Sequence, residues 1–198
     1  MIPVSIHALA TATPPHILDQ ATGAMVAEQL LGDAFDDFSR LRSIYSNAGI
    51  EFRQLARPVE WYTRSRSMVE RTAVYLDVAL DLFVEAAQKA LSEAGIDAAD
   101  VDAIVTVSST GIATPSLEAR AMGRMGFRDD VARVPMFGLG CAGGVTGLAL
   151  AAKLARVDQG ATVLFVTVEL CSLALRTENV GKADIVSTAL FGDGAAAE

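Results

Sequence analysis

Short apolar runs with the character of β-strands alternate along this chain with segments that have the apolar spacing of α-helices. Residues 103–107 and 161–168 are apolar enough to be buried strands. Residues 69–94 repeat apolar side chains at helical spacing, and Gly95 follows them where a helix commonly ends. This alternation predicts a layered α/β fold with a largely buried sheet.

The remaining elements are predicted from turn signals and local apolar patterns. Strands are expected at residues 4–9 and 133–137, and residues 195–198 resemble the opening of another. Helices are expected at residues 20–31, 33–46, 114–126, 142–158 and 183–190, and residues 58–66 are expected to be irregular. Thr114 should cap its helix, with Pro115 at the first helical position. The 198 residues contain no internal repeat and no linker, and they suffice for one domain with a core.

The composition argues against several broad classes of protein. With 52% hydrophobic and 20% charged residues, the chain is not of the disordered kind. A net charge of -8 argues against nucleic acid as the main partner. No apolar run is as long as a membrane span, and the N-terminus lacks the features of a secretory signal. Two cysteines 30 residues apart do not form the pattern of a disulfide framework, so a reducing cytoplasm is the expected location.

One segment departs from the acidic character of the chain. Residues 1–39 contain no lysine or arginine, whereas residues 40–71 contain seven arginines against three glutamates. The arginines are Arg40, Arg42, Arg53, Arg57, Arg64, Arg66 and Arg71. A basic segment on an acidic protein fits a small anionic ligand, such as the phosphates of coenzyme A. A solvated helix face fits most of these arginines equally well.

The glycine-rich junction at residues 138–144 carries the strongest candidate for chemistry, Cys141. Glycines before Cys141 permit a sharp turn between a strand and a helix. Gly143 and Gly144 would let the new helix lie close to its neighbours. Residues 145–155 are almost all small or apolar, so this helix is expected to be buried in the middle of the domain.

The expected position of Cys141 at the start of a helix allows two interpretations. Free N–H groups and the positive end of the helix dipole favour a thiolate, the form of cysteine that attacks a thioester. A structural cysteine that packs as a small hydrophobic side chain fits the local sequence equally well. The two histidines are His7, in an expected strand, and His16, after a Pro-Pro turn, and neither context suggests pairing with Cys141.

Five motifs resemble those of type III polyketide synthases, the chalcone and stilbene synthase superfamily. The run Gly140-Cys141-Ala142-Gly143-Gly144 is similar to the nucleophile motif of that family. The other motifs agree in order and spacing, and they lie at residues 12–20, 108–116, 168–171 and 189–197. The resemblance extends over the whole chain.

The resemblance implies a thiolase-like fold, which is a layered αβα architecture made of two similar halves. Residues 1–198 would form the N-terminal thiolase-like domain, ending before the C-terminal half. It implies an acyltransferase in which Cys141 takes an acyl group from a coenzyme A thioester. Malonyl-CoA then decarboxylates, and the resulting carbanion attacks the Cys-bound thioester. It also implies a homodimer, no metal, and no cofactor beyond the coenzyme A thioesters that serve as substrates.

The resemblance also assigns roles to individual residues. Phe191 matches the gatekeeping phenylalanine of the family, although an ordinary core aromatic residue would fit that position by itself. Arg40 matches a basic contact to coenzyme A, and Thr114 matches the position that reaches across the dimer interface. The residues that match the lining of the elongation cavity are Ser109, Thr114, Cys171, Ala174 and Ser187.

The family's catalytic histidine and asparagine belong to its second half, which residues 1–198 do not include. Residues 1–198 by themselves are therefore expected to lack condensing activity. Two other interpretations stay open. One is a condensing enzyme similar to 3-oxoacyl-ACP synthase III, which uses acyl carrier protein. The other is a catalytically incompetent half-domain that serves only in dimerisation. The loop at residues 109–115 and the run at residues 141–144 favour a type III polyketide synthase over the first.

Overall fold

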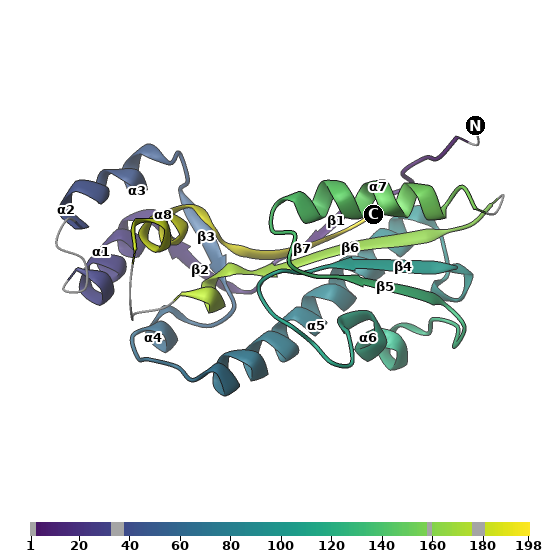
Figure 1. Ribbon diagram of the computed structural model, residues 1–198, viewed down its shortest axis with the longest axis horizontal. Coiled ribbons are helices and arrows are strands. Elements are labelled where there is room, and N and C mark those ends of the chain that lie inside the picture. The colour runs from purple at the N-terminus through teal and green to yellow at the C-terminus, as the bar shows by residue number, and fades with distance from the viewer. Residues whose placement is uncertain (1–2, 33–37, 158–159, 176–180) are drawn as a thin grey trace. The chain divides into compact units, whose positions relative to one another are not determined.

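The structure is a computed structural model that describes residues 3–32, 38–157, 160–175 and 181–198 (Figure 1). The chain forms two compact units. The large unit consists of residues 1–13, 75–169 and 194–198. The small unit consists of residues 14–74 and 170–193.

A five-stranded sheet forms the centre of the large unit. Its strands, in spatial order, are β1 (Ala10–Ala12), β7 (Asp193–Ala197), β6 (Val163–Leu170), β4 (Ala103–Val107) and β5 (Ala132–Met136). β4 lies parallel to both β5 and β6, and β1 lies antiparallel to β7. All five residues of β4 are buried, Thr106 included, as the largely apolar sequence of this strand predicted.

Helices cover the two faces of this sheet. Figure 1 shows α7 (Ala142–Leu154) on one side, and α5 (Met68–Ala94) with α6 (Leu117–Met125) on the other. α5 begins in the small unit and passes into the large unit at Tyr75. It ends as predicted, with Gly95 in a left-handed conformation (φ 66°) before the short 3-10 helix η1 (Ala98–Asp100). The predicted layered α/β architecture is confirmed.

The predicted strand at residues 4–9 is wrong, because the first strand of the structure is β1. β1 pairs with β7 over three residues, from Ala10 opposite Ala197 to Ala12 opposite Ala195. Residues 4–9 are irregular, and the Ile6 side chain in this segment is 63% exposed. An apolar run becomes a strand only where a neighbouring strand accepts and donates its hydrogen bonds.

The predicted start of the helix after Thr114 is also wrong. Ser116 is the N-cap residue of α6, in an extended conformation, so Pro115 lies outside the helix rather than at its first position. The peptide bond between Thr114 and Pro115 is cis. The predicted end is confirmed, because Gly126 adopts a left-handed conformation (φ 78°) directly after the last helical residue.

The small unit contains helices and one two-stranded sheet. β2 (His16–Asp19) and β3 (Phe52–Leu55) pair antiparallel. The helices of the unit are α1 (Gln20–Leu31), α2 (Phe38–Leu41), α3 (Ser43–Asn47), α4 (Val59–Tyr62), the 3-10 helix η2 (Cys171–Ala174) and α8 (Lys182–Leu190). A buried hydrophobic cluster joins α1, α2, α3 and α8, and it consists of Ala24, Ala27, Leu31, Phe38, Tyr45, Ile185 and Ala189.

Two predicted helices of the small unit, α1 and α8, are confirmed, and two other predictions need correction. α1 begins at the predicted residue, where the Asp19 carboxylate accepts a hydrogen bond from the Thr22 N–H at 2.9 Å. The predicted helix at residues 33–46 is replaced by the short helices α2 and α3, and residues 33–37 lie outside the described residues. Residues 58–66 contain α4. Helices of four or five residues offer too few positions for a periodic pattern to be recognised.

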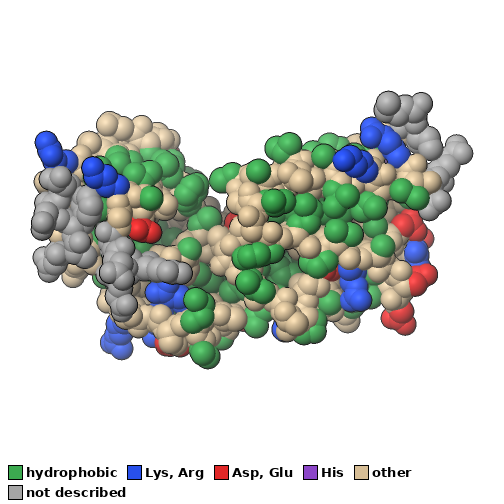
Figure 2. Space-filling model, viewed as in Figure 1, with side chains coloured by type: hydrophobic (Ala, Val, Ile, Leu, Met, Phe, Trp, Pro, Cys, Tyr) green, Lys and Arg blue, Asp and Glu red, His purple; other side chains and the backbone are tan. Residues whose placement is uncertain are grey.

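α7 is only partly buried, whereas its sequence predicted a helix buried in the middle of the domain. Gly143, Gly147 and Ala151 form its buried face, while the Val145 side chain is 77% exposed. Figure 2 shows hydrophobic side chains at the surface in this region of the large unit. An apolar sequence indicates that a helix can be buried, but it does not say which neighbours cover each face. Neither α7 nor any other helix in the described residues is long and apolar enough to cross a membrane.

Candidate functional site

Cys141 lies between β5 and α7, at the N-cap position of the helix, and its side chain is exposed. Gly138 (φ 82°) and Gly140 (φ 54°) precede it in left-handed conformations that residues with a side chain rarely adopt. The Gly143 N–H donates to the Gly140 carbonyl oxygen at 2.8 Å and closes the turn. The structure therefore confirms the predicted sharp turn and the start of a helix at this cysteine.

The glycines of α7 differ in what surrounds them. A Cβ added at Gly143 would lie 2.5 Å from Val107 Cγ1, which confirms the predicted close packing at this position. The same prediction is wrong for Gly144, because apart from its chain neighbours and the backbone of α7 no described atom lies within 4 Å of a Cβ added there. Gly147, which the sequence did not single out, takes that role, since its added Cβ would lie 2.5 Å from Phe165 Cε2.

Ser109 contacts the turn that carries Cys141. Its Oγ accepts a hydrogen bond from the Gly140 N–H at 3.0 Å. The Glu169 carboxylate, near the end of β6, accepts hydrogen bonds from the Ser109 N–H at 2.8 Å, the Thr110 N–H at 2.9 Å and the Thr110 hydroxyl at 2.7 Å. A series of hydrogen bonds therefore links β6, the loop after β4 and the turn at the cysteine.

Tyr75 of α5 supports the same loop. Its hydroxyl donates a hydrogen bond to Ser108 Oγ at 2.8 Å. Burial raises the pKa of Tyr75 above its ordinary value, although the hydrogen bond with Ser108 acts in the opposite direction. A Cβ added at Gly111 would lie 2.4 Å from the Tyr75 ring, so the loop passes directly over the ring. Thr114 is exposed further along this loop.

The other site residues assigned from the sequence lie in the small unit. Cys171 and Ala174 bound η2, Ser187 lies on α8, and Phe191 is the C-cap residue of α8. The Phe191 N–H donates to the Ser187 carbonyl oxygen at 3.0 Å, so the structure brings these two residues together. The Phe191 side chain is 45% exposed. Arg40 lies apart from them in sequence, on α2, and is exposed.

Arg53 of β3 reaches the end of α8 with its guanidinium group. Its Nη1 donates hydrogen bonds to the carbonyl oxygens of Thr188 and, at 3.3 Å, Phe191. The residue is only 7% exposed. Burial lowers the pKa of Arg53, and the nearby Tyr45 and Asp193 oppose that shift. This member of the basic segment is therefore not part of a solvated helix face, because it is buried and donates to carbonyl oxygens of the protein backbone.

Asp193 fixes the chain two residues after Phe191. One carboxylate oxygen accepts hydrogen bonds from the Ala56 N–H at 2.6 Å and from the Ser172 hydroxyl, and the other accepts one from the Ser172 N–H at 2.8 Å. Burial raises the pKa of Asp193 to about 6, and the hydrogen bonds from Ser172 and Ala56 together with the charge of Arg53 oppose the rise.

Other arginines of the basic segment make contacts within the small unit. Arg42 Nη1 lies 3.0 Å from Glu28 Oε2, and Arg66 Nη1 lies 3.2 Å from Glu70 Oε1. The Arg66 guanidinium also lies over the Trp61 ring, 4.9 Å from its centroid. A count of arginines therefore overstates the positive charge that is available to an anionic ligand.

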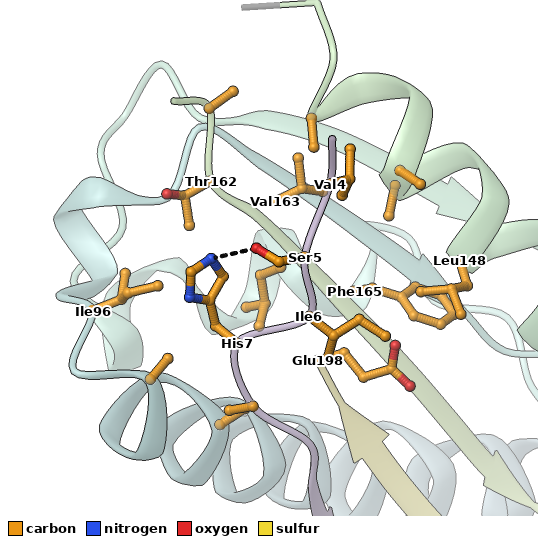
Figure 3. Close-up of a pocket in the computed structure, with 18 of the residues that line it drawn as sticks. Val4, Ser5, Ile6, His7, Ile96, Leu148, Thr162, Val163, Phe165 and Glu198 are labelled. Atoms are coloured by element: carbon orange, nitrogen blue, oxygen red, sulfur yellow. Dashed lines mark hydrogen bonds between the residues drawn. The ribbon is translucent and has the colours of Figure 1, made fainter. Parts of the chain in front are cut away.

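A cavity of about 630 Å³ in the large unit does not belong to this site (Figure 3). It is lined by residues 3–8, by parts of α5, α7 and β6, and by Glu198. Within it, Ser5 Oγ lies 3.2 Å from His7 Nε2. None of the site residues assigned from the sequence is among the residues that line it.

Sequence reasoning missed three side chains that organise these segments. Glu169 could have been singled out as a lone carboxylate at the end of an apolar strand, and Asp193 as the acid between two glycines. Arg53 gave no such signal, because it stands among six other arginines in residues 40–71. Its burial depends on contacts with residues more than 130 positions away.

Comparison with known proteins adds evidence that is independent of this geometry. Residues 3–198 match the family model of chalcone and stilbene synthases, N-terminal domain. The 1,3,6,8-tetrahydroxynaphthalene synthase of Streptomyces peucetius subsp. caesius is 42% identical over 193 residues, which cover 98% of this chain and 51% of that protein.

Solved structures are similar over nearly the whole chain. The 1,3,6,8-tetrahydroxynaphthalene synthase of Streptomyces coelicolor A3(2), a bacterial type III polyketide synthase, gives a TM-score of 0.90 at 28% identity and covers 96% of this chain and 54% of its own. Germicidin synthase from Streptomyces coelicolor, another type III polyketide synthase, gives a TM-score of 0.86 at 25% identity and covers 96% of this chain and 57% of its own. The chain spans about half the length of these relatives.

Proposed function

The chain belongs to the chalcone and stilbene synthase family of type III polyketide synthases, and from that membership we propose that Cys141 carries the acyl group in a condensation of acyl-CoA with malonyl-CoA. Its α/β architecture is the thiolase-like fold of this family. The proposal concerns the intact protein, which here means the whole chain in which residues 1–198 occur.

The observation that carries the proposal is the environment of Cys141. Its exposed side chain stands at the N-terminus of α7, where free N–H groups and the helix dipole favour negative charge. Gly138 and Gly140 give the backbone a conformation that presents the side chain, and Ser109 holds the Gly140 N–H. A cysteine that only packs as a small hydrophobic group needs neither an exposed position nor such a turn.

The proposed reaction has two stages. In the first, the Cys141 sulfur attacks the carbonyl carbon of an acyl-CoA, a carbon–sulfur bond forms to the enzyme, and coenzyme A leaves as its thiol. In the second, malonyl-CoA loses carbon dioxide, and the carbanion attacks the Cys-bound carbonyl. A carbon–carbon bond forms, the bond to Cys141 breaks, and the extended acyl group remains on coenzyme A.

The remaining assignments are part of the same proposal. Phe191 acts as the gatekeeping phenylalanine of the family, called the gate below, and Arg40 contacts coenzyme A. The elongation cavity is lined by Ser109, Thr114, Cys171, Ala174 and Ser187. Thr114 reaches the partner in a homodimer, and no cofactor acts besides the coenzyme A thioesters. The catalytic histidine and asparagine of the family come from outside residues 1–198, so we expect no condensation from these residues alone.

A condensation assay without carrier protein tests the proposal. The intact protein, given acyl-CoA and malonyl-CoA only, should form polyketide products, and Cys141→Ala should lower their rate by about 10⁴-fold or more, as expected for loss of a nucleophile. Product formation only after acyl carrier protein is added would contradict the assignment. Activity retained by Cys141→Ala would contradict it as well.

A further inference from the structure

The end of α8 in the small unit is capped by side chains that come from far away in the sequence. Arg53 Nη1 donates to the Thr188 and Phe191 carbonyl oxygens, and Gln20 Nε2 donates to the Ala189 carbonyl oxygen at 2.9 Å. The last carbonyl groups of a helix have no partner within the helix, and a cation at this end also complements the helix dipole. Arg53 therefore satisfies two of these groups with one guanidinium.

Gly23 and Gly192 of the small unit border a narrow slot that holds the Arg53 side chain. A Cβ added at Gly23 would lie 2.8 Å from Arg53 Nη2, and one added at Gly192 would lie 3.3 Å from Arg53 Cβ. Buried arginines are rare unless they are paired, and Asp193 supplies the opposite charge here. The slot, the two carbonyl oxygens and the nearby carboxylate together indicate that Arg53 has a defined structural partner rather than an incidental one.

The backbone around Phe191 is held from several sides, whereas its ring is not. The Phe191 N–H donates to the Ser187 carbonyl oxygen at 3.0 Å, and its own carbonyl oxygen accepts from Arg53. Two residues later, Asp193 accepts hydrogen bonds from the N–H groups of Ala56 and Ser172. The Phe191 side chain, by contrast, is 45% exposed. A change in the backbone that carries the ring would therefore change the direction of the ring.

We propose that Arg53 is a positioning residue which holds the backbone of Phe191 and thereby sets the direction of its ring and the length of the polyketide that the enzyme releases. This inference rests on the proposed function, in which Phe191 is the gate. Arg53 touches no substrate in this scheme. It acts only through the carbonyl oxygens of Thr188 and Phe191.

Arg53→Lys in the intact protein is the primary test. Lysine keeps the positive charge, but its Nζ lies one atom nearer the backbone than Nη1, the atom of Arg53 that donates to both carbonyl oxygens. We expect the turnover number for extension to fall about tenfold and the ratio of short to full-length products to rise about fivefold, while the KM for the starter acyl-CoA stays within about twofold. Arg124→Lys makes the same change at an exposed arginine that pairs with Asp81 in the large unit, and it should alter none of these quantities. Unchanged products from a folded Arg53→Lys variant would overturn the inference.

A double-mutant cycle shows whether Arg53 acts through Phe191. If it does, Arg53→Lys should change the product ratio in the wild-type background and add almost nothing in a Phe191→Ala background. Equal effects in both backgrounds would overturn the inference. If Phe191→Ala leaves the products unchanged, the proposed role of Phe191 as gatekeeping residue is contradicted. Positioning by Arg53 is then tested by a measurement that does not use activity.

That measurement is the ¹⁹F NMR spectrum of 4-fluorophenylalanine placed at position 191. One narrow resonance is expected with Arg53 present, and a shifted, broadened or split resonance with Arg53→Lys. An unchanged spectrum would overturn the inference whatever the products are. Should Arg53→Lys fail to fold, Gly192→Ala serves as the second variant, because it keeps the arginine and places a methyl group 3.3 Å from its Cβ. Gly192→Ala should change the spectrum in the same sense, and an unchanged spectrum would again overturn the inference.

Discussion

The turn at residues 138–141 in the large unit and the segment at residues 191–193 in the small unit each present a residue to which we assign a function. They are held in place by different means. Left-handed glycines and the start of α7 shape the first. The Ser109 side chain supports it by accepting a hydrogen bond from the Gly140 N–H. Buried polar side chains, Arg53 and Asp193, shape the second.

This difference explains why the first of the two segments can be recognised in the sequence more easily than the second. The Ser109–Gly140 contact joins residues 31 positions apart, and the glycines that shape the turn are visible in the motif itself. The contacts from Arg53 to Phe191 and from Ala56 to Asp193 join residues 138 and 137 positions apart. The stability of a segment held by buried charged side chains should depend on pH. The stability of a segment held by close packing at glycines should depend instead on added side-chain volume. Two predictions test this contrast, beginning with the larger effect.

The first prediction concerns the stability of the small unit as a function of pH. Burial raises the pKa of Asp193 from 3.8 to about 6, so the folded state favours the protonated carboxyl. The stabilisation from that proton is fully present below pH 3.8 and is lost as the pH rises through about 6. The free energy of unfolding should therefore fall by about 3 kcal/mol across this range because of this group.

Urea unfolding of the intact protein between pH 3.5 and pH 7 measures the effect, and Asp193→Asn isolates it. The variant has no titrating group at this position, so its stability should fall less steeply with pH than that of the wild type. Parallel pH profiles for the two proteins would show that buried charge does not govern this segment.

The second prediction concerns two adjacent glycines next to Cys141. Gly143→Ala would place a Cβ 2.5 Å from Val107 Cγ1 and should destabilise the large unit by about 2 kcal/mol through overpacking. Gly144→Ala is the matched control, because apart from the chain neighbours and the backbone of α7 no described atom lies within 4 Å of the added Cβ. Alanine is the better helix former, so this variant should gain up to about 1 kcal/mol. Thermal unfolding compares the two, and a shift in the same direction for both would contradict packing at Gly143 as the constraint.

The sequence was sufficient for features that depend on local pattern. The buried strand β4 and the long helix α5 repeat apolar residues over enough positions to be recognised, and the glycines before Cys141 revealed its turn. Predictions failed where the structure of a segment depends on neighbouring elements that its local sequence pattern does not identify. Residues 4–9 have the pattern of a strand but no neighbouring strand to pair with. α7 was expected to be buried in the middle of the domain, but the described residues bury only one of its faces.

The buried polar side chains could not be predicted for a related reason. Arg53 looked like any arginine of a basic segment, since nothing near it in the sequence indicates that Gly23 and Gly192 leave room for it. Whether a charged residue is solvated or buried depends on residues that the fold brings to it. Family resemblance pointed to Phe191 but not to the side chains that hold its backbone.

Peptide mass spectrometry of the intact protein after incubation with a starter acyl-CoA shows whether Cys141 carries the acyl group. We expect one acyl group on the peptide that contains Cys141, its loss in Cys141→Ala, and its retention on Cys141 in Cys171→Ala. The second variant is the matched control, because Cys171 is the other cysteine of the chain. An acyl group on the Cys171 peptide, or acylation that persists in Cys141→Ala, would contradict the account.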